Sequence, residues 1–161
     1  MNVRSAPDPE FLRRAITLAT ENVLAGKGGP FGAVIVRDGR IVGEAANAVT
    51  TTYDPTAHAE VNAIRAACRT LETFVLEGCE LYSSCEPCPM CLAASYWARL
   101  DVIYYGCSAA DAAQAGFDDA FLYAEFRKER QFRALPVRQM LAEEARVSFE
   151  AWMASPIKIP Y

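Results

Sequence analysis

The chain has 161 residues, of which 52% are hydrophobic and 22% charged, so it can fill a core and is not a disordered or low-complexity protein. Its length suits a single domain over residues 1–161. Sixteen Lys and Arg side chains against twenty Asp and Glu give a net charge of −4, and this lack of basic excess predicts no nucleic-acid partner.

The cellular compartment is indicated by the first residues and by the cysteines. Residues 1–10 contain two prolines and two acidic side chains but no apolar run, which is unlike a secretory leader. No stretch approaches the roughly 20 apolar residues of a membrane span. Six cysteines in such a chain are typical of a reducing compartment, where clustered thiols bind metals or do chemistry. We therefore expect a cytoplasmic protein without membrane contact.

The first half of the chain predicts a helix, a hairpin and a second helix. Apolar residues recur at helical spacing from Phe11 to Leu24, ahead of three closely spaced glycines. Asp38-Gly39 separates runs at 31–37 and 40–48, which predicts two antiparallel strands, and a polar loop is expected over 49–56. His58–Leu71 lacks Gly and Pro and predicts the second helix.

The second half predicts a parallel crossover. Strands are expected at Glu80–Ser84 and Val102–Gly106, with a helix at Met90–Leu100 between them, and this order indicates the α/β class. A loop with a short helix is expected over 109–119. Two more helices are expected over 120–130 and 140–154, and the mixed charges of Arg127–Arg133 are interpreted as a solvated helix face.

Three residues offer the ligands of a catalytic zinc. Zinc prefers imidazole nitrogen and thiolate sulfur, and a catalytic ion needs three protein ligands with the fourth position left for water. His58, the single histidine, opens the second helix, and Cys88 and Cys91 open the third. The positive end of a helix favours thiolates. We therefore expect one zinc per chain.

Glu60 and Cys85 lead to two different interpretations of that zinc. Glu60 lies two residues after His58, close enough to take a proton from a zinc-bound water and return it. Cys85 completes C-x-x-C-x-x-C, and a four-ligand site that included it would be closed and structural, as in an interaction module. That alternative leaves Glu60 without a purpose. Cys68, Cys79 and Cys107 are expected to be small buried residues.

The motifs also carry a family resemblance. His58-Ala59-Glu60 followed by Pro87-Cys88 and Cys91 matches H-x-E…P-C-x-x-C, the signature of zinc base deaminases. The sequence resembles the cytidine-deaminase-like superfamily and, within it, the bacterial guanine deaminases. Further matching stretches are 29–33, 54–60, 96–99, 115–119 and the terminal Tyr161. The likeness begins near Phe11 and is weakest over 126–138.

This resemblance implies a fold and a reaction. It implies a three-layer α/β fold with a mixed five-stranded sheet between helices, a homodimer, and hydrolysis of guanine to xanthine and ammonia in purine salvage or catabolism. A zinc-bound hydroxide would attack C2 of the purine while Glu60 carries the proton to ring nitrogen N3. By the same resemblance, Asp119 would shuttle a second proton to the leaving amino group.

The resemblance further implies the contacts with the base. Asn47 would hydrogen-bond the purine, and three aromatic residues would stack on it. The implied contact residues are Phe31, Asn47, Ala59, Trp97, Phe117 and Tyr161. By residue type alone, each of the aromatic residues belongs more often to a core than to a base clamp. Asn47 would be equally at home in a turn, and Asp118 or Asp119 at a helix cap.

The C-terminus is unusually apolar. Pro156 breaks the last helix, yet Ile157, Ile159 and Tyr161 keep an alternating apolar pattern. A tail of this kind, about residues 155–161, is expected to dock. The resemblance suggests that it closes an active site, favouring the partner's in a swapped arrangement; the alternative is packing on its own core.

Two related enzymes share the zinc chemistry and remain rivals. One is a tRNA adenosine deaminase, which the net charge disfavours, although a local basic patch would be enough to hold RNA. The other is a deaminase of cytosine, cytidine or an aminotriazine.

Overall fold

The computed structural model describes residues 6–161, so the first half of the 1–10 segment lies outside the described residues. The chain divides into two compact units, residues 1–122 and 123–161, and each is described by itself. No described helix is long and apolar enough to cross a membrane.

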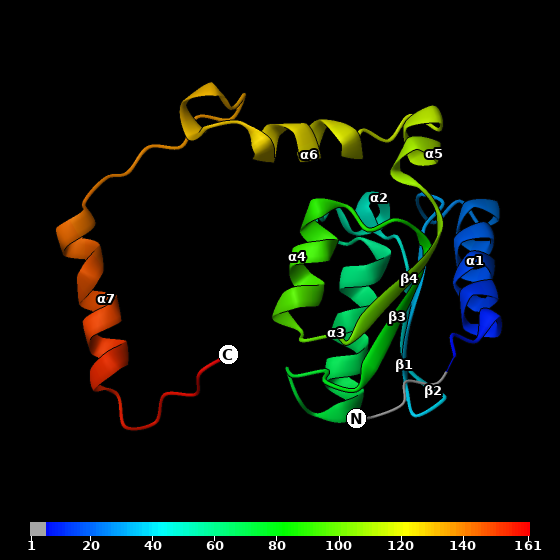
Figure 1. The fold of residues 1–161 in the computed structure, drawn as a ribbon, viewed down its shortest axis with the longest axis horizontal. Coiled ribbons are helices and arrows are strands. Elements are labelled where there is room, and N and C mark those ends of the chain that lie inside the picture. Colours follow the sequence, from blue (N-terminus) through cyan, green and yellow to red (C-terminus); the bar gives the residue numbers. More distant parts are fainter. Residues whose placement is uncertain (1–5) are drawn as a thin grey trace. The chain divides into compact units, whose positions relative to one another are not determined.

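The first unit is built on a mixed sheet in the order β2-β1-β3-β4 (Figure 1). Strand β1 (Gly32–Arg37) pairs antiparallel with β2 (Arg40–Ala46) and with β3 (Cys79–Cys85). Strand β3 pairs in parallel with β4 (Val102–Cys107). The α/β class, the hairpin at Asp38-Gly39 and the parallel crossover are confirmed.

The expectation of a fifth strand is wrong for the described chain, which has four. A strand exists where a neighbouring strand supplies hydrogen bonds. Residues 133–141 are the longest stretch without helix in the second unit, and they pair with no strand. Strand β4 is accordingly an edge of the sheet.

Helices cover both faces of the sheet (Figure 1). Helix α1 (Pro9–Leu24) packs on one face, and α3 (Ala59–Leu71) with α4 (Pro89–Trp97) lies on the other. Side chains alternate along a strand, so Val34 joins the core beneath α1 whereas Ile35 joins the core beneath α3.

Two glycines let these helices lie close to the sheet. A Cβ on Gly32 would be 2.2 Å from the Ala15 carbonyl oxygen of α1. A Cβ on Gly43 would be 2.5 Å from the Ala67 nitrogen of α3. Both distances are shorter than real Cβ contacts, so the helix positions depend on these glycines.

Some boundaries differ from the sequence predictions. The polar loop expected at 49–56 contains a short helix, α2 (Val49–Thr52), in which the Ala48 carbonyl accepts from the Thr52 amide and from two threonine hydroxyls. Helix α4 ends at Trp97, before the expected Leu100, because Arg99 adopts a left-handed φ of 61°.

Beyond β4 the chain is helical. Helix α5 (Ala109–Gln114) begins at a capping box of Ser108 and Asp111, as the expected short helix in a loop. Helix α6 (Asp119–Arg127) is followed by a 3-10 turn (Arg130–Phe132) and by α7 (Ala142–Ala154). The charge run at 127–133 is solvent-exposed over most of its length, but it is no helix face, because α6 ends at Arg127.

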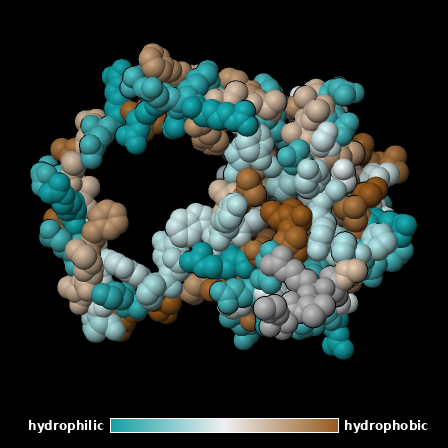
Figure 2. All heavy atoms as spheres, in the orientation of Figure 1, coloured by the Kyte–Doolittle hydropathy of each residue, from teal (hydrophilic) through white to brown (hydrophobic). Residues whose placement is uncertain are grey.

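The second unit exposes much apolar surface. No residue of α7 is buried, and Phe149, Met153 and Ile157 are 68%, 62% and 85% exposed. Figure 2 shows hydrophobic residues among hydrophilic ones along this segment. Ile159 and Tyr161 are exposed as well, so docking of the tail stays a prediction about the assembled protein.

Candidate active site

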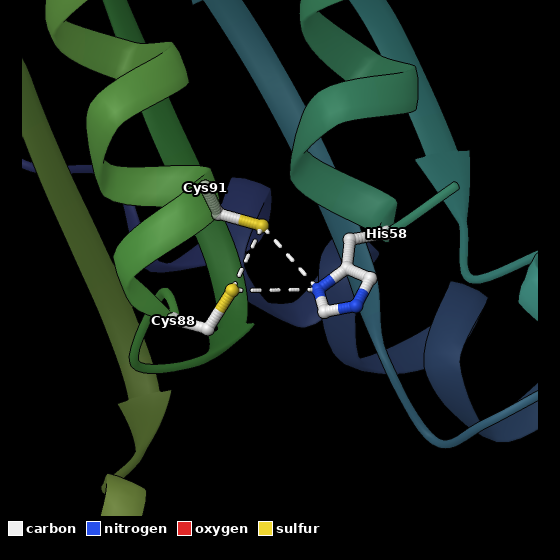
Figure 3. A group of neighbouring side chains, drawn as sticks. All are labelled: His58, Cys88 and Cys91. Atoms are coloured by element: carbon white, nitrogen blue, oxygen red, sulfur yellow. Dashed lines mark hydrogen bonds between the residues drawn. The ribbon is translucent and has the colours of Figure 1, made fainter. Parts of the chain in front are cut away.

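The three expected zinc ligands come together at two helix starts. His58 is the N-cap of α3, Cys88 is the N-cap of α4, and Cys91 lies in the first turn of α4 (Figure 3). Pro89 follows Cys88 at the start of α4, where its missing N–H costs no hydrogen bond. The packing of α3 beside α4 brings the two helix starts together.

The spacing of the three ligand atoms fits a tetrahedral zinc. The Nδ1 atom of His58 is 3.5 Å from each sulfur, and the two sulfurs are 3.6 Å apart. Zinc–sulfur and zinc–nitrogen bonds of about 2.3 and 2.0–2.1 Å at tetrahedral angles imply edges of about 3.5–3.8 Å. These residues therefore fit zinc with three protein ligands.

In the absence of metal, the three ligand side chains share protons through hydrogen bonds. The hydrogen bond with Cys91 lowers the pKa of Cys88, and the same bond raises the pKa of Cys91. The hydrogen bond with Cys88 raises the pKa of His58. The metal-free site thus holds protons that a metal would displace, because zinc binds thiolate and neutral imidazole.

Glu60 is buried beside these ligands, in the first turn of α3. Its Oε2 atom is 3.4 Å from the Cys91 sulfur, and its Oε1 atom accepts a hydrogen bond of 3.0 Å from the Ser83 hydroxyl of β3. Burial raises the pKa of Glu60, and the bond from Ser83 opposes that effect. A carboxyl whose pKa is raised in this way is better suited to accept and return a proton than an exposed one.

Cys85 is directed elsewhere. Its thiol donates to the Ser108 carbonyl oxygen at 3.6 Å, and burial raises its pKa to about 11. Among the described residues, the group that could hold a metal contains His58, Cys88 and Cys91. The geometry favours an open three-ligand site over the closed one. Of the other cysteines, Cys79 is buried as expected, but Cys107 is exposed.

A cavity of about 360 Å³ opens beside these groups, at the lower end of the size range of small-molecule sites. Two aromatic rings face it: Phe31 and Phe117 meet edge to face with centroids 4.7 Å apart. The cavity is lined by Gly29, Phe31, Asn47, Val49, Thr50, His58, Glu60, Glu86, Cys88, Phe117 and Asp119.

The orientation of the Asn47 amide is fixed by the backbone around it. Its Oδ1 atom accepts from the Gly29 amide at 3.4 Å and from the Val49 amide at 3.2 Å. Because backbone N–H groups only donate, the oxygen must face them. The amide nitrogen is left for the cavity, so Asn47 can offer a hydrogen-bond donor to a ligand.

The two neighbouring aspartates, Asp118 and Asp119, have different surroundings in the structure. Asp118 accepts from the Phe121 amide and caps α6. Asp119 lines the cavity instead, and burial raises the pKa of its carboxyl. A carboxyl in that environment can exchange a proton with a bound ligand.

The remaining expected contact residues do not line the cavity. Ala59 is the first residue of α3 and is fully buried, and Trp97 and Tyr161 are 63% and 74% exposed. Their roles stay predictions.

Glu86 is a cavity residue that sequence reasoning missed. Its Oε2 atom accepts from the Ala109 amide at 2.9 Å, and its own amide donates to the Cys107 carbonyl. It therefore ties the metal-ligand loop to the start of α5, which leads to Phe117 and Asp119. Its place between Cys85 and Pro87, inside the zinc motif, was the available signal.

Comparisons with known proteins agree with this site. Residues 5–107 match the family model of the cytidine and deoxycytidylate deaminase zinc-binding region. A guanine deaminase of Bacillus subtilis is 56% identical over 88% of this chain and 91% of its own. A tRNA-specific adenosine deaminase of Aquifex aeolicus is 47% identical over 57% of this chain and 60% of its own.

A solved structure extends the likeness to the whole fold. The X-ray structure of guanine deaminase from Bacillus subtilis superimposes with a TM-score of 0.93 at 52% identity. It covers 97% of this chain and 99% of that one.

Proposed function

The chain belongs to the family of the cytidine and deoxycytidylate deaminase zinc-binding region, and from this premise we propose that it is a zinc-dependent guanine deaminase. The reaction converts guanine and water into xanthine and ammonia. The observation that carries the chemistry is the buried Glu60 carboxyl beside the His58, Cys88 and Cys91 group on one cavity. The likeness to guanine deaminase over most of the chain supports the choice of base.

His58, Cys88 and Cys91 would hold the metal. Bound zinc supplies a Lewis acid that lowers the pKa of water to near 7. Glu60 accepts the proton of the attacking water on Oε2, the oxygen nearer the ligand sulfurs. It then delivers this proton to ring nitrogen N3 as oxygen adds to C2. The pKa raised by burial suits both steps, because the same carboxyl must take up and release one proton.

Three residues orient the base. Asn47 donates from its amide nitrogen to an acceptor of the purine, since its oxygen is held by Gly29 and Val49. Phe31 and Phe117 offer apolar ring surface to the base on the cavity wall. Guanine offers acceptors at O6 and N7 and a flat aromatic ring, so it suits this combination.

Asp119 serves the leaving group. The amino group must depart as ammonia, so a second proton has to reach its nitrogen after C2 becomes tetrahedral. The hydroxyl gained by C2 loses its own proton as the carbonyl of xanthine forms, and this proton restores the Asp119 carboxyl. The Asp119 carboxyl lies on the same cavity as Glu60, and its raised pKa favours the protonated form that can donate.

The assembly and location are part of the proposal. We infer a homodimer in which residues 155–161 close an active site, because this segment exposes Ile157 and Ile159 in the single chain. Six free cysteines agree with a reducing, cytoplasmic compartment.

A substrate panel tests this proposal. Zinc-loaded protein is supplied with guanine, guanosine, adenine, cytosine, cytidine, the aminotriazine ammeline and tRNA, and ammonia release is measured. We expect guanine to give the highest kcat/KM. Faster release from adenosine in tRNA, or from a pyrimidine, would reject guanine as the substrate and leave the zinc chemistry in place.

A further inference from the structure

A buried asparagine outside the cavity joins the two segments that carry the base-binding residues. Asn22 lies in the last turns of α1 and is 8% exposed. Its Nδ2 atom donates 2.9 Å hydrogen bonds to the carbonyl oxygens of Gly29 and Asn47. Carbonyl oxygens only accept, so the amide orientation is unambiguous. One side chain therefore bridges two loops that are 18 residues apart in the sequence.

The two bonded carbonyls belong to a closed network around Phe31. The Gly29 oxygen also accepts from the Phe31 amide at 2.9 Å, and the Phe31 oxygen accepts from the Asn47 amide at 3.0 Å. The Asn47 side-chain oxygen accepts in turn from Gly29. Asn22 thus holds the backbone of Gly29 and of Asn47. These two residues are bonded in turn to the backbone of Phe31, whose ring lines the cavity together with Asn47.

The Asn22 side chain and the two loops that it joins are tightly packed at Gly28. A Cβ on Gly28 would lie 2.3 Å from the Asn47 carbonyl oxygen and 2.9 Å from the Asn22 Nδ2 atom. The loop after α1 therefore packs directly on the Asn47 backbone. Loss of the bridge would let the two loops separate. It would remove the Asn22 donor from the buried Asn47 carbonyl, whereas the Gly29 carbonyl would keep its bond from the Phe31 amide.

We propose that Asn22 is a positioning residue for purine recognition, which acts through Asn47 and Gly29 without touching the substrate. This inference rests on the proposed function, because it assumes that Asn47 binds the base. It assigns a role in substrate binding to a residue of α1, a helix that contributes no side chain to the cavity.

A double-mutant cycle tests the coupling. Asn22→Leu keeps the number and branching of the side-chain heavy atoms but removes the donor group that makes both bonds, and it is combined with Asn47→Ala. KM and kcat are measured for guanine. The inhibition constant is measured for hypoxanthine, which lacks the C2 amino group and cannot be deaminated.

We expect Asn22→Leu to raise KM and the inhibition constant about tenfold, which corresponds to the loss of about one neutral hydrogen bond, with a smaller change in kcat. In the Asn47→Ala background the same substitution should change both constants by less than about twofold, because the Asn47 side-chain amide that Asn22 positions is gone.

Arg14→Leu is the matched control. Arg14 lies on the same helix and joins it to β2 through two hydrogen bonds with Glu44, at 2.9 and 2.6 Å, away from the cavity. It should lower the melting temperature without changing KM. Should Asn22→Leu not fold, the milder Asn22→Ala replaces it in the cycle.

Three outcomes would overturn the inference: an unchanged KM in Asn22→Leu, an equal factor in both backgrounds, or the same rise in Arg14→Leu. A wild-type protein that releases no ammonia from guanine would instead reject the proposed function itself.

Discussion

The Glu60 carboxyl is held between opposing influences that set its pKa. Burial raises that pKa, and the hydroxyl of Ser83 lowers it by donating to the charged form. The neighbouring hydroxyl of Ser84 serves a different purpose, since it accepts from the Gly32 amide at 3.0 Å. Two adjacent serines of β3 therefore provide a variant and its control.

Ser83→Ala should move the acidic limb of the kcat/KM profile to higher pH. Removal of a donor from the carboxylate destabilises the charged form, so the pKa of Glu60 rises. Glu60 must be a charged carboxylate to accept a proton. As the pH is lowered, the variant therefore loses activity at a higher pH than the wild type does. Rates measured from pH 5 to 9 check this, and Ser84→Ala should leave the limb in place. A limb unmoved in Ser83→Ala, or moved equally in both, would contradict the assigned role of Ser83.

The cysteines provide the second prediction at this scale. Cys88→Ser should strip the metal, because three ligands become two. Cys85→Ser should retain about one zinc per chain, since its thiol bonds to Ser108. Zinc content per chain measures both variants. Equal metal loss in the two variants would favour the alternative interpretation, a closed structural site in which Cys85 is a fourth ligand.

At the residue scale, the sequence predicts the metal group well and its surroundings poorly. His58, Cys88 and Cys91 are recognisable because zinc demands particular ligand types, and two of them are three residues apart. The Asn22 bridge could not be predicted, because its partners are the backbone carbonyls of residues 29 and 47. Every residue has such a carbonyl, so the sequence does not show which ones accept a hydrogen bond. Asp118 and Asp119 are alike in sequence, and their surroundings alone distinguish them.

At the element scale, the site depends on how closely α3 lies against the sheet. This helix carries His58 at its start and Glu60 in its first turn. Gly43 of β2 permits the approach, because a Cβ there would be 2.5 Å from the Ala67 nitrogen and 2.6 Å from the Ala63 oxygen. The packing of a helix on a strand thus sets the position of a metal ligand.

Gly43→Ala should therefore displace α3 and weaken zinc binding. Forcing a methyl group into this contact should cost about 1–3 kcal/mol of unfolding free energy. Melting temperature and zinc affinity against a chelator measure the two effects. Val42→Ala, which removes methyl groups from the same core, should lower stability by about 1 kcal/mol and keep the zinc affinity. Zinc affinity unchanged in Gly43→Ala would show that the ligand geometry tolerates movement of α3.

Elements were predictable where local chemistry determines them. The Asp38-Gly39 turn and the apolar spacing of α1 are local signals, and both are found. Helix α2 was missed because its residues, Val49–Thr52, have poor helix propensity, and the Ala48 carbonyl stabilises it through hydroxyl groups. The fifth strand was implied by resemblance and depends on a ladder partner that local sequence cannot specify.

At the scale of the whole molecule, residues 123–161 are the unusual part. They form a unit of their own, with many exposed apolar side chains that include Phe126, Phe132 and Leu135 at 60%, 67% and 76%. Apolar surface of this extent is typical of an interface. In the proposed homodimer, a second copy of the chain would cover this surface.

Deletion of Pro160 and Tyr161 should cut guanine turnover sharply and leave zinc content and dimer intact, because a closing tail excludes water and orients the base. Mixing this shortened chain with a full-length Glu60→Gln chain identifies whose site the tail closes. Recovered activity would mean that tails are exchanged between subunits. No recovery in confirmed heterodimers would show that each tail serves its own chain, and full activity of the shortened chain would exclude a closing role.

The most direct test of the account measures xanthine and ammonia formed from guanine by zinc-loaded wild-type protein and by Glu60→Gln with the same zinc content. We predict equal amounts of the two products from the wild type, and a rate about 10²- to 10⁴-fold lower in Glu60→Gln, since one buried carboxyl carries the proton. Comparable rates in the two proteins, or a wild type that holds zinc and forms no xanthine, would contradict the account.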